Sequence, residues 1–173
     1  MEVVLAIHVA AGLTGVVAGA VAASARKRAG RHPAAGRIYL GALAVLVVTA
    51  GIMAAIRWPD DVHLLVIGSV AAALAFGGWR ARRRHRPGWV RRHAIGVGGS
   101  YIALLTGFYV DNGPQLPIWD RLPSWAFWVL PSVVGIPLIA RALRRYGSGA
   151  SRRPARAGRP GAWPRPRRPG VSR

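Results

Sequence analysis

Five histidines are the residues of this 173-residue chain whose type and spacing could support chemistry: His8, His32, His63, His85 and His93. Imidazole ligates metal ions and haem iron, and it exchanges protons near neutral pH. The chain has no Cys, which excludes disulfides, iron–sulfur clusters and thiolate zinc sites. It also has no nucleophile–base pair, HEXXH sequence or glycine-rich phosphate loop. Any chemistry of this chain is therefore expected to be that of histidine.

Five apolar segments must position these histidines. They cover residues 3–23, 38–56, 62–79, 94–110 and 125–140, and none contains Asp, Glu, Lys or Arg. A helix rises 1.5 Å per residue, so about 20 residues cross a hydrocarbon core. A soluble helix would show a polar stripe, yet the second segment offers only Tyr39 and Thr49. The sequence predicts an all-α fold, a polytopic membrane helix bundle with five transmembrane helices over residues 1–142. Pro131 and Pro137 are expected to kink the fifth helix.

Charge placement predicts the orientation of this bundle. All of the 25 basic residues except Arg57 and Arg121 lie in residues 24–37, 80–93 and from 141 onward. The five acidic residues lie at the N-terminus or in the other two connections. Cytoplasmic loops collect Lys and Arg, so we expect the N-terminus outside and the C-terminus inside. The positive charge follows the first apolar segment instead of preceding it, which favours a retained helix over a cleaved signal peptide.

The last residues, 143–173, consist mainly of Arg, Pro, Gly, Ser and Ala. Such a composition cannot bury a core, so we predict a disordered cytoplasmic tail. Its charge would suit nucleic acid or anionic lipid headgroups. Tethering to a membrane favours the lipid headgroups, and Trp163 is the one tryptophan that the tail offers for stacking on a base. We therefore expect the Arg-rich loops and tail to bind lipid and no nucleic acid.

The four histidines near the apolar segments form two predicted pairs. His8 and His63 lie near the outer ends of the first and third segments, and His32 and His93 near the inner ends of the second and fourth. Imidazoles on alternate helices could ligate a haem iron from both sides, which makes haem b a possible cofactor and a quinone or redox protein a possible partner. The alternative is that these histidines are ordinary interfacial residues, with His8 bonded to a neighbouring helix.

Small residues recur every four positions in three of the apolar segments. Such ridges let membrane helices pack closely, because helix association in lipid depends on packing. A tightly packed bundle is expected from the following residues: Ala11, Gly15 and Gly19; Gly68 and Ala72; Gly99, Ala103 and Gly107.

Residues 8–43 resemble the opening of a family of bacterial multi-pass membrane proteins known only as domain of unknown function 2306. The shared pattern is a His and small residues in the first helix, then His-x-x-x-Gly-Arg-x-Tyr entering the second, here His8, Gly12, His32, Gly36, Arg37 and Tyr39. Residues 89–113 resemble a later part of such proteins. The resemblance implies an integral membrane protein without an assigned activity. A weaker similarity, of arrangement only, is to two-haem membrane cytochromes b.

Three functions remain open from the sequence. The first is a small protein of the bacterial plasma membrane with a structural or interaction role. The second is a bis-histidine haem b electron carrier, with His8 and His63 holding an outer haem and His32 and His93 an inner one. The third, a small-solute channel or transporter, is disfavoured because no charged residue lies within an apolar segment.

Overall fold

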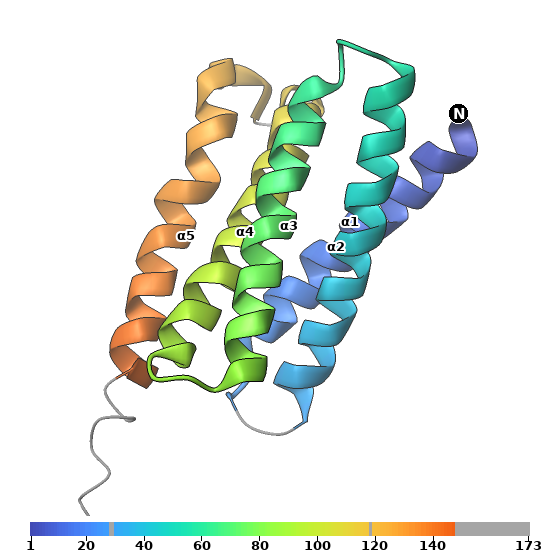
Figure 1. Cartoon of the computed structure of the whole chain (residues 1–173). Helices are drawn as coiled ribbons and strands as arrows, with labels where there is room; N and C mark the ends of the chain where they lie inside the picture. The colour runs from blue at the N-terminus through green and yellow to red at the C-terminus, as the bar shows by residue number, and fades with distance from the viewer. Residues whose placement is uncertain (28–29, 118, 148–173) are drawn as a thin grey trace, which may run out of the picture.

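The computed structural model describes residues 1–27, 30–117 and 119–147, and across these ranges it contains helices and no strand. The helices are α1 (Glu2–Ser24), α2 (Arg31–Ile56), α3 (Val62–Arg84), α4 (Trp89–Asn112) and α5 (Ser124–Gly147). Two short 3₁₀ helices, η1 (Gly113–Gln115) and η2 (Trp119–Arg121), connect α4 to α5. Successive helices run in opposite directions, and α1 crosses behind α2 at a steep angle (Figure 1).

The helix surfaces show why this sequence forms such a bundle. All five helices are long and apolar enough to cross a membrane. Large apolar side chains cover the outside, with Val3 72%, Val17 62% and Val133 61% exposed. The buried positions are instead held mostly by alanine and glycine. Exposing a large apolar side chain to water costs roughly 1.5–3 kcal/mol, so this surface suits a hydrocarbon surrounding.

The helices extend beyond the predicted segments at one end of the bundle. α2 begins before residue 38, α3 continues past 79, α4 begins before 94 and α5 continues past 140. The predicted segments stopped at the first charged residue, but a helix forms its backbone hydrogen bonds whether or not its side chains are charged. α5 also continues through Pro131 and Pro137 as one helix and ends at Gly147, past the predicted domain boundary at 142. The rest of the predicted tail, 148–173, lies outside the described residues.

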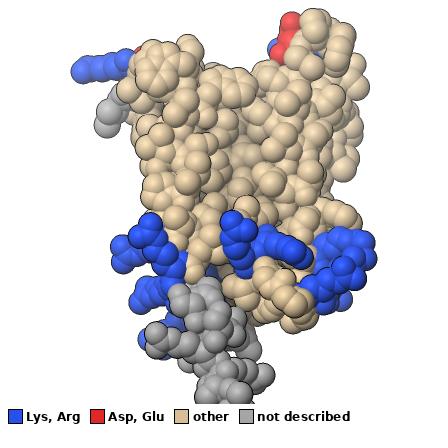
Figure 2. Space-filling view, turned by 60° about the vertical axis from the view of Figure 1, so that its left-hand side comes forward, with Lys and Arg blue, Asp and Glu red and all other residues tan. Residues whose placement is uncertain are grey.

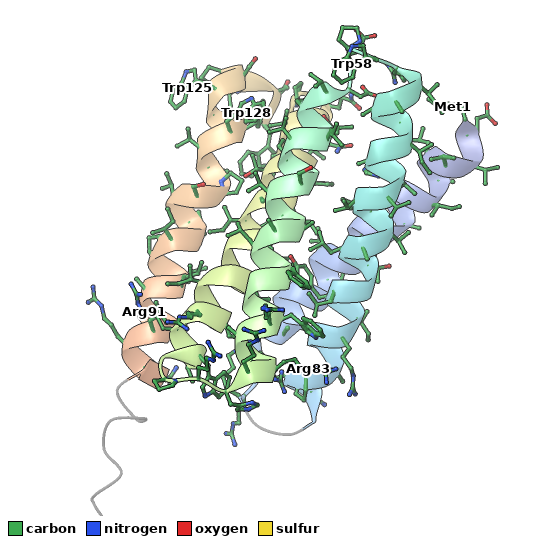
Figure 3. All side chains as sticks on the ribbon, viewed as in Figure 1. Met1, Trp58, Arg83, Arg91, Trp125 and Trp128 are labelled. Atoms are coloured by element: carbon green, nitrogen blue, oxygen red, sulfur yellow. The ribbon has the colours of Figure 1, made fainter. Side chains whose placement is uncertain are left out.

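The two ends of the bundle carry opposite kinds of side chain. Most Lys and Arg gather at one end of the molecule, and on the face shown a wide uncharged band separates them from the other end, where the acidic residues lie with a few basic side chains (Figure 2). Arg83 and Arg91 lie at the basic end, and Trp58, Trp125 and Trp128 lie at the other (Figure 3). The α1–α2 connection, the α3–α4 connection and the end of α5 therefore all lie at the basic end.

Glycines set the closest approaches between helices. A Cβ on Gly96 would lie 2.7 Å from the Cα and N of Gly78 and from the carbonyl oxygen of Leu74, so α3 and α4 meet backbone to backbone. α1 reaches α4 where Gly15 faces Leu104 and Gly19 faces Tyr101. The buried residues Ala11, Gly15 and Gly19 confirm the expected ridge in α1. In α4 the buried residues are Gly96, Ser100, Leu104 and Thr106. The expected ridge of Gly99, Ala103 and Gly107 is half-buried, with Gly99 against Leu74 and Gly107 against Ile67 of α3.

A hydroxyl cluster closes the core between α1, α2 and α4. The hydroxyls of Tyr39 and Ser100 lie 2.8 Å apart, and Ser100 Oγ lies 2.8 Å from the Val97 carbonyl oxygen. Tyr101 donates to the Val16 carbonyl oxygen at 2.9 Å, and its ring meets that of Tyr39 edge to face. Buried hydroxyls are costly unless bonded. Within the described residues, no buried side-chain nitrogen or oxygen lacks a partner.

Replacing Gly96 with alanine should separate α3 from α4, because the new methyl group meets backbone atoms that cannot rotate away. We expect a loss of about 1–3 kcal/mol in the free energy of unfolding, the usual cost of overpacking. Thermal unfolding in detergent measures it. Gly77→Ala is the matched control: nothing lies within 4 Å of its Cβ position, and it should be neutral or stabilising by up to about 1 kcal/mol. Equal losses in both variants would contradict the backbone contact.

Candidate functional site

His8 joins α1 to α2 in the half of the bundle away from the basic end. Its Nδ1 lies 2.9 Å from Thr49 Oγ1, and Thr49 is buried. The hydroxyl hydrogen of Thr49 is directed at the backbone, since Oγ1 lies 2.9 Å from the Val45 and 3.0 Å from the Leu46 carbonyl oxygen. Thr49 therefore accepts from His8, and Nδ1 carries the ring hydrogen. This matches the alternative in which His8 bonds a neighbouring helix.

His63 joins α3 to α4 at the end opposite the arginines. Its Nε2 lies 2.9 Å from Asp111 Oδ1, and its Nδ1 lies 3.2 Å from the Asp60 carbonyl oxygen. Both partners accept hydrogen bonds, so the two bonds form together only when each ring nitrogen carries a hydrogen. About a third of each side chain in the His63–Asp111 pair is exposed. The pair therefore links α3 to α4 at a partly hydrated position.

The structure does not bring the predicted outer pair together. Within the described ranges, no hydrogen bond or ring contact joins His8 to His63. Both nitrogens of His63 lie beside oxygen atoms, those of Asp111 and of the Asp60 carbonyl, so an iron ion would have to displace one of these contacts. Sequence reasoning placed both histidines at similar depth but missed Asp111 as the partner of His63. The sequence did contain a signal for this contact. An acidic residue follows one apolar segment, and a histidine starts another.

The predicted inner pair does lie together. The ring centroids of His32 and His93 are 6.4 Å apart, and the ring planes are perpendicular. His32 Nδ1 lies 2.9 Å from the Ala22 carbonyl oxygen in the last turn of α1, and His93 Nδ1 lies 3.1 Å from the Gly78 carbonyl oxygen in α3. A carbonyl oxygen can only accept, so Nδ1 carries the hydrogen in both rings.

The Nε2 atoms of this inner pair are left available. Among the described residues, no hydrogen bond involves Nε2 of His32 or of His93. No buried side-chain nitrogen there lacks a partner, so both Nε2 atoms keep some accessible surface. Histidines that ligate a metal usually anchor their other nitrogen on a carbonyl or carboxylate. The inner pair has this anchored form on both rings.

Local packing explains why the inner histidines occupy these places. The close contact between Gly78 and Gly96 brings α4 against α3, so His93, one turn before Gly96, reaches the Gly78 carbonyl oxygen. The end of α1 is closed by Lys27, whose Nζ donates to the Ala22 and Ala23 carbonyl oxygens at 2.7 Å each. His32 bonds the same Ala22 carbonyl, so it also closes α1.

Positive charge and aromatic rings surround the inner pair. Lys27 and Arg82 lie close enough to both rings to interact with them electrostatically, and burial lowers the pKa of Lys27. Trp89 lies 6.4 Å from His93 and 5.0 Å from His85, measured between ring centroids. Nearby cations disfavour a bare divalent metal ion and favour an anion or a ligand that carries carboxylates. In the described part of the chain, no group of three or more His, Asp or Glu could hold a metal ion.

No protein-family model, curated protein or solved structure matches the chain. The resemblance to the family of membrane proteins stays a prediction, and function has to be inferred from the side chains described above.

The hydrogen positions of the inner pair can be tested directly. Selectively nitrogen-labelled histidine in detergent-solubilised protein should show His32 and His93 protonated at Nδ1 and free at Nε2 at neutral pH, because both Nδ1 atoms face backbone carbonyls. The two-bond nitrogen–proton spectrum distinguishes the two tautomers. His85 is the internal reference because it is exposed, with one long bond of 3.4 Å. Nε2-protonated rings at both positions would contradict the anchoring.

Proposed function

We propose that the chain is a multi-pass protein of the bacterial plasma membrane, with its N-terminus outside, its C-terminus inside and a structural or interaction role. The observation that carries this proposal is the uncharged apolar band between a basic end and an acidic end (Figure 2). Such a band in water would expose large side chains on every helix. In hydrocarbon the same surface costs nothing, and the charged ends lie among the headgroups.

The basic end supplies the partner in this proposal. Each Lys or Arg near an anionic leaflet contributes about 1 kcal/mol of attraction, so many such residues hold the protein firmly against the headgroups. Arg83 also stacks over the Trp79 ring, with its guanidinium carbon 5.2 Å from the ring centroid, an arrangement suited to the interface. Anionic lipid is therefore the proposed partner of the basic end.

The proposed topology predicts which turns an impermeant thiol reagent reaches in intact cells. The chain has no Cys, so a single introduced cysteine reports its own location. Gln115→Cys, on exposed η1, should be labelled in intact cells, and Arg86→Cys, in the exposed α3–α4 turn, only after lysis. The two variants control for each other. The reverse pattern would overturn the orientation, and labelling of both before lysis would overturn the five crossings.

The inner histidines favour a second candidate function, a haem b protein that carries electrons. Two imidazoles that share one metal ion through bonds of about 2 Å have ring centres roughly 6 Å apart, and His32 and His93 are 6.4 Å apart. His32 and His93 would be the residues that hold the iron through their Nε2 atoms, and Lys27 and Arg82 would attract the carboxylates of the group. Haem, when bound, supplies one-electron transfer, for which a quinone or redox protein would be the partner. The outer pair, His8 and His63, has no ring contact among the described residues, and each of these histidines has a hydrogen-bond partner of its own, so the inner pair is the stronger candidate.

Haem binding has a spectroscopic test. Protein purified from cells supplied with haem precursor should show a Soret band and a reduced-minus-oxidised difference spectrum. His32→Ala and His93→Ala should each abolish both signals, because each removes one of the two ligands. His63→Ala, the control, should keep them. A colourless wild-type preparation with full helical circular dichroism would end this candidate, and retention of the signals in both inner variants would refute the assigned ligands.

A further inference from the structure

An apolar groove runs between α1 and α2. It has a volume of about 480 Å³ and is lined by Leu13, Thr14, Val17, Ala18, Val21, Ala35 and Ile38. It lies between two helices that cross at a steep angle (Figure 1). The volume falls in the range of about 300–1,000 Å³ usual for small-molecule sites. The one hydroxyl in its lining, that of Thr14, already donates to the Ala10 carbonyl oxygen, and the groove offers a largely apolar surface.

The groove lies in the half of the bundle nearer the basic end. α1 runs toward that end, and the lining residues from 13 to 21 occupy its second half, a length of about 12 Å. α2 starts from the same end, and its lining residues Ala35 and Ile38 belong to its first turns. A straight apolar chain lying in the groove would therefore have one end at the basic rim.

Positive side chains stand where the groove meets that rim. Arg31, Ala35 and Ile38 follow one another at helical spacing, so exposed Arg31 lies on the face of α2 that lines the groove. On the other wall, the Lys27 ammonium is held at the end of α1 by the Ala22 and Ala23 carbonyl oxygens. Three helical residues separate Val21 from the end of α1, so this charge lies about one turn beyond the lining. The groove thus pairs an apolar trough with a cationic end.

We propose that this groove binds one anionic phospholipid, with an acyl chain along the trough and the phosphate held by Arg31 and Lys27. The inference rests on the proposed membrane location. The surrounding bilayer is as apolar as the groove, so the trough supplies shape and the charges supply selectivity. A transmembrane helix of a second chain would fill the trough equally, but its apolar surface would bring no anion to Arg31 and Lys27. Charge complementarity therefore favours the phospholipid.

Native mass spectrometry of the full chain can count the retained lipid. Protein is purified with equal amounts of palmitoyl-oleoyl phosphatidylglycerol and phosphatidylcholine, and the wild type should keep the phosphatidylglycerol. Arg31→Gln should lower that retention about fivefold, the effect of one basic residue near a lipid phosphate. The matched control is Arg84→Gln, an exposed arginine at the other basic turn, which should lower retention clearly less than Arg31→Gln does.

The trough is tested with Val17→Trp, which fills the groove from a position that is 62% exposed and outside the core. It should release the bound lipid. Val133→Trp, at the equally exposed position on α5, is the control and should retain it. Val17→Phe repeats the test with a smaller ring if Val17→Trp lowers the helical circular dichroism.

The outcomes separate the two proposals. Loss of phosphatidylglycerol preference in the wild type would overturn both headgroup binding and this site. Equal losses in Arg31→Gln and Arg84→Gln would show diffuse binding by the whole basic end, overturning the site and leaving the proposed function intact. A wild-type dimer that Val17→Trp dissociates would assign the groove to a second copy of the chain and likewise overturn the lipid site.

Discussion

Close approach between helices is the constraint on which this bundle depends. Its sides between the charged ends are apolar all round, so in the proposed membrane location the helices would gain little from turning apolar side chains inward. Attraction must come from van der Waals packing and from interhelical hydrogen bonds, and both require short distances. Gly78 and Gly96 provide the shortest approach, and Gly15 and Gly19 bring α1 to α4.

The same constraint decides how polar side chains are used. With large residues outside, the interior consists mainly of alanine and glycine, and a few hydroxyls and imidazoles cross it. Tyr101, His32 and His93 each bond a backbone carbonyl of another helix, which ties helices together without burying an unpaired group. Because these carbonyls only accept, they also determine which ring nitrogen is left free. Helix packing and the chemistry available at the inner histidines are thus linked.

The two ends of the bundle use histidine differently because their charges differ. His63 Nε2 lies beside Asp111 Oδ1, and its Nδ1 lies beside the Asp60 carbonyl oxygen. His32 and His93 lie beside Lys27 and Arg82, where no described acidic group bonds them, and their Nε2 atoms stay accessible. A ligand-binding role is therefore proposed for the basic end alone. The groove between α1 and α2 reaches the same end, which concentrates both proposed binding sites there.

The amino-acid sequence by itself determined the five apolar helices and the separation of basic from acidic connections. These features depend on composition along the chain, because an uncharged run of sufficient length needs no partner to reveal it. The position of each histidine along its helix followed from the same counting. Counting apolar residues could not give the true end of each helix, because the backbone stays helical into the charged turns.

Only the tertiary structure decided which side chains meet. A sequence without a polar stripe does not show how apolar helices are rotated and tilted. It therefore could not show that His32 and His93 contact each other while His8 and His63 bond other residues. The backbone contact of Gly78 with Gly96, the Tyr39–Ser100 bond and the groove between α1 and α2 depend on angles between helices. Those angles are set by packing of many small residues at once, and no single residue encodes them.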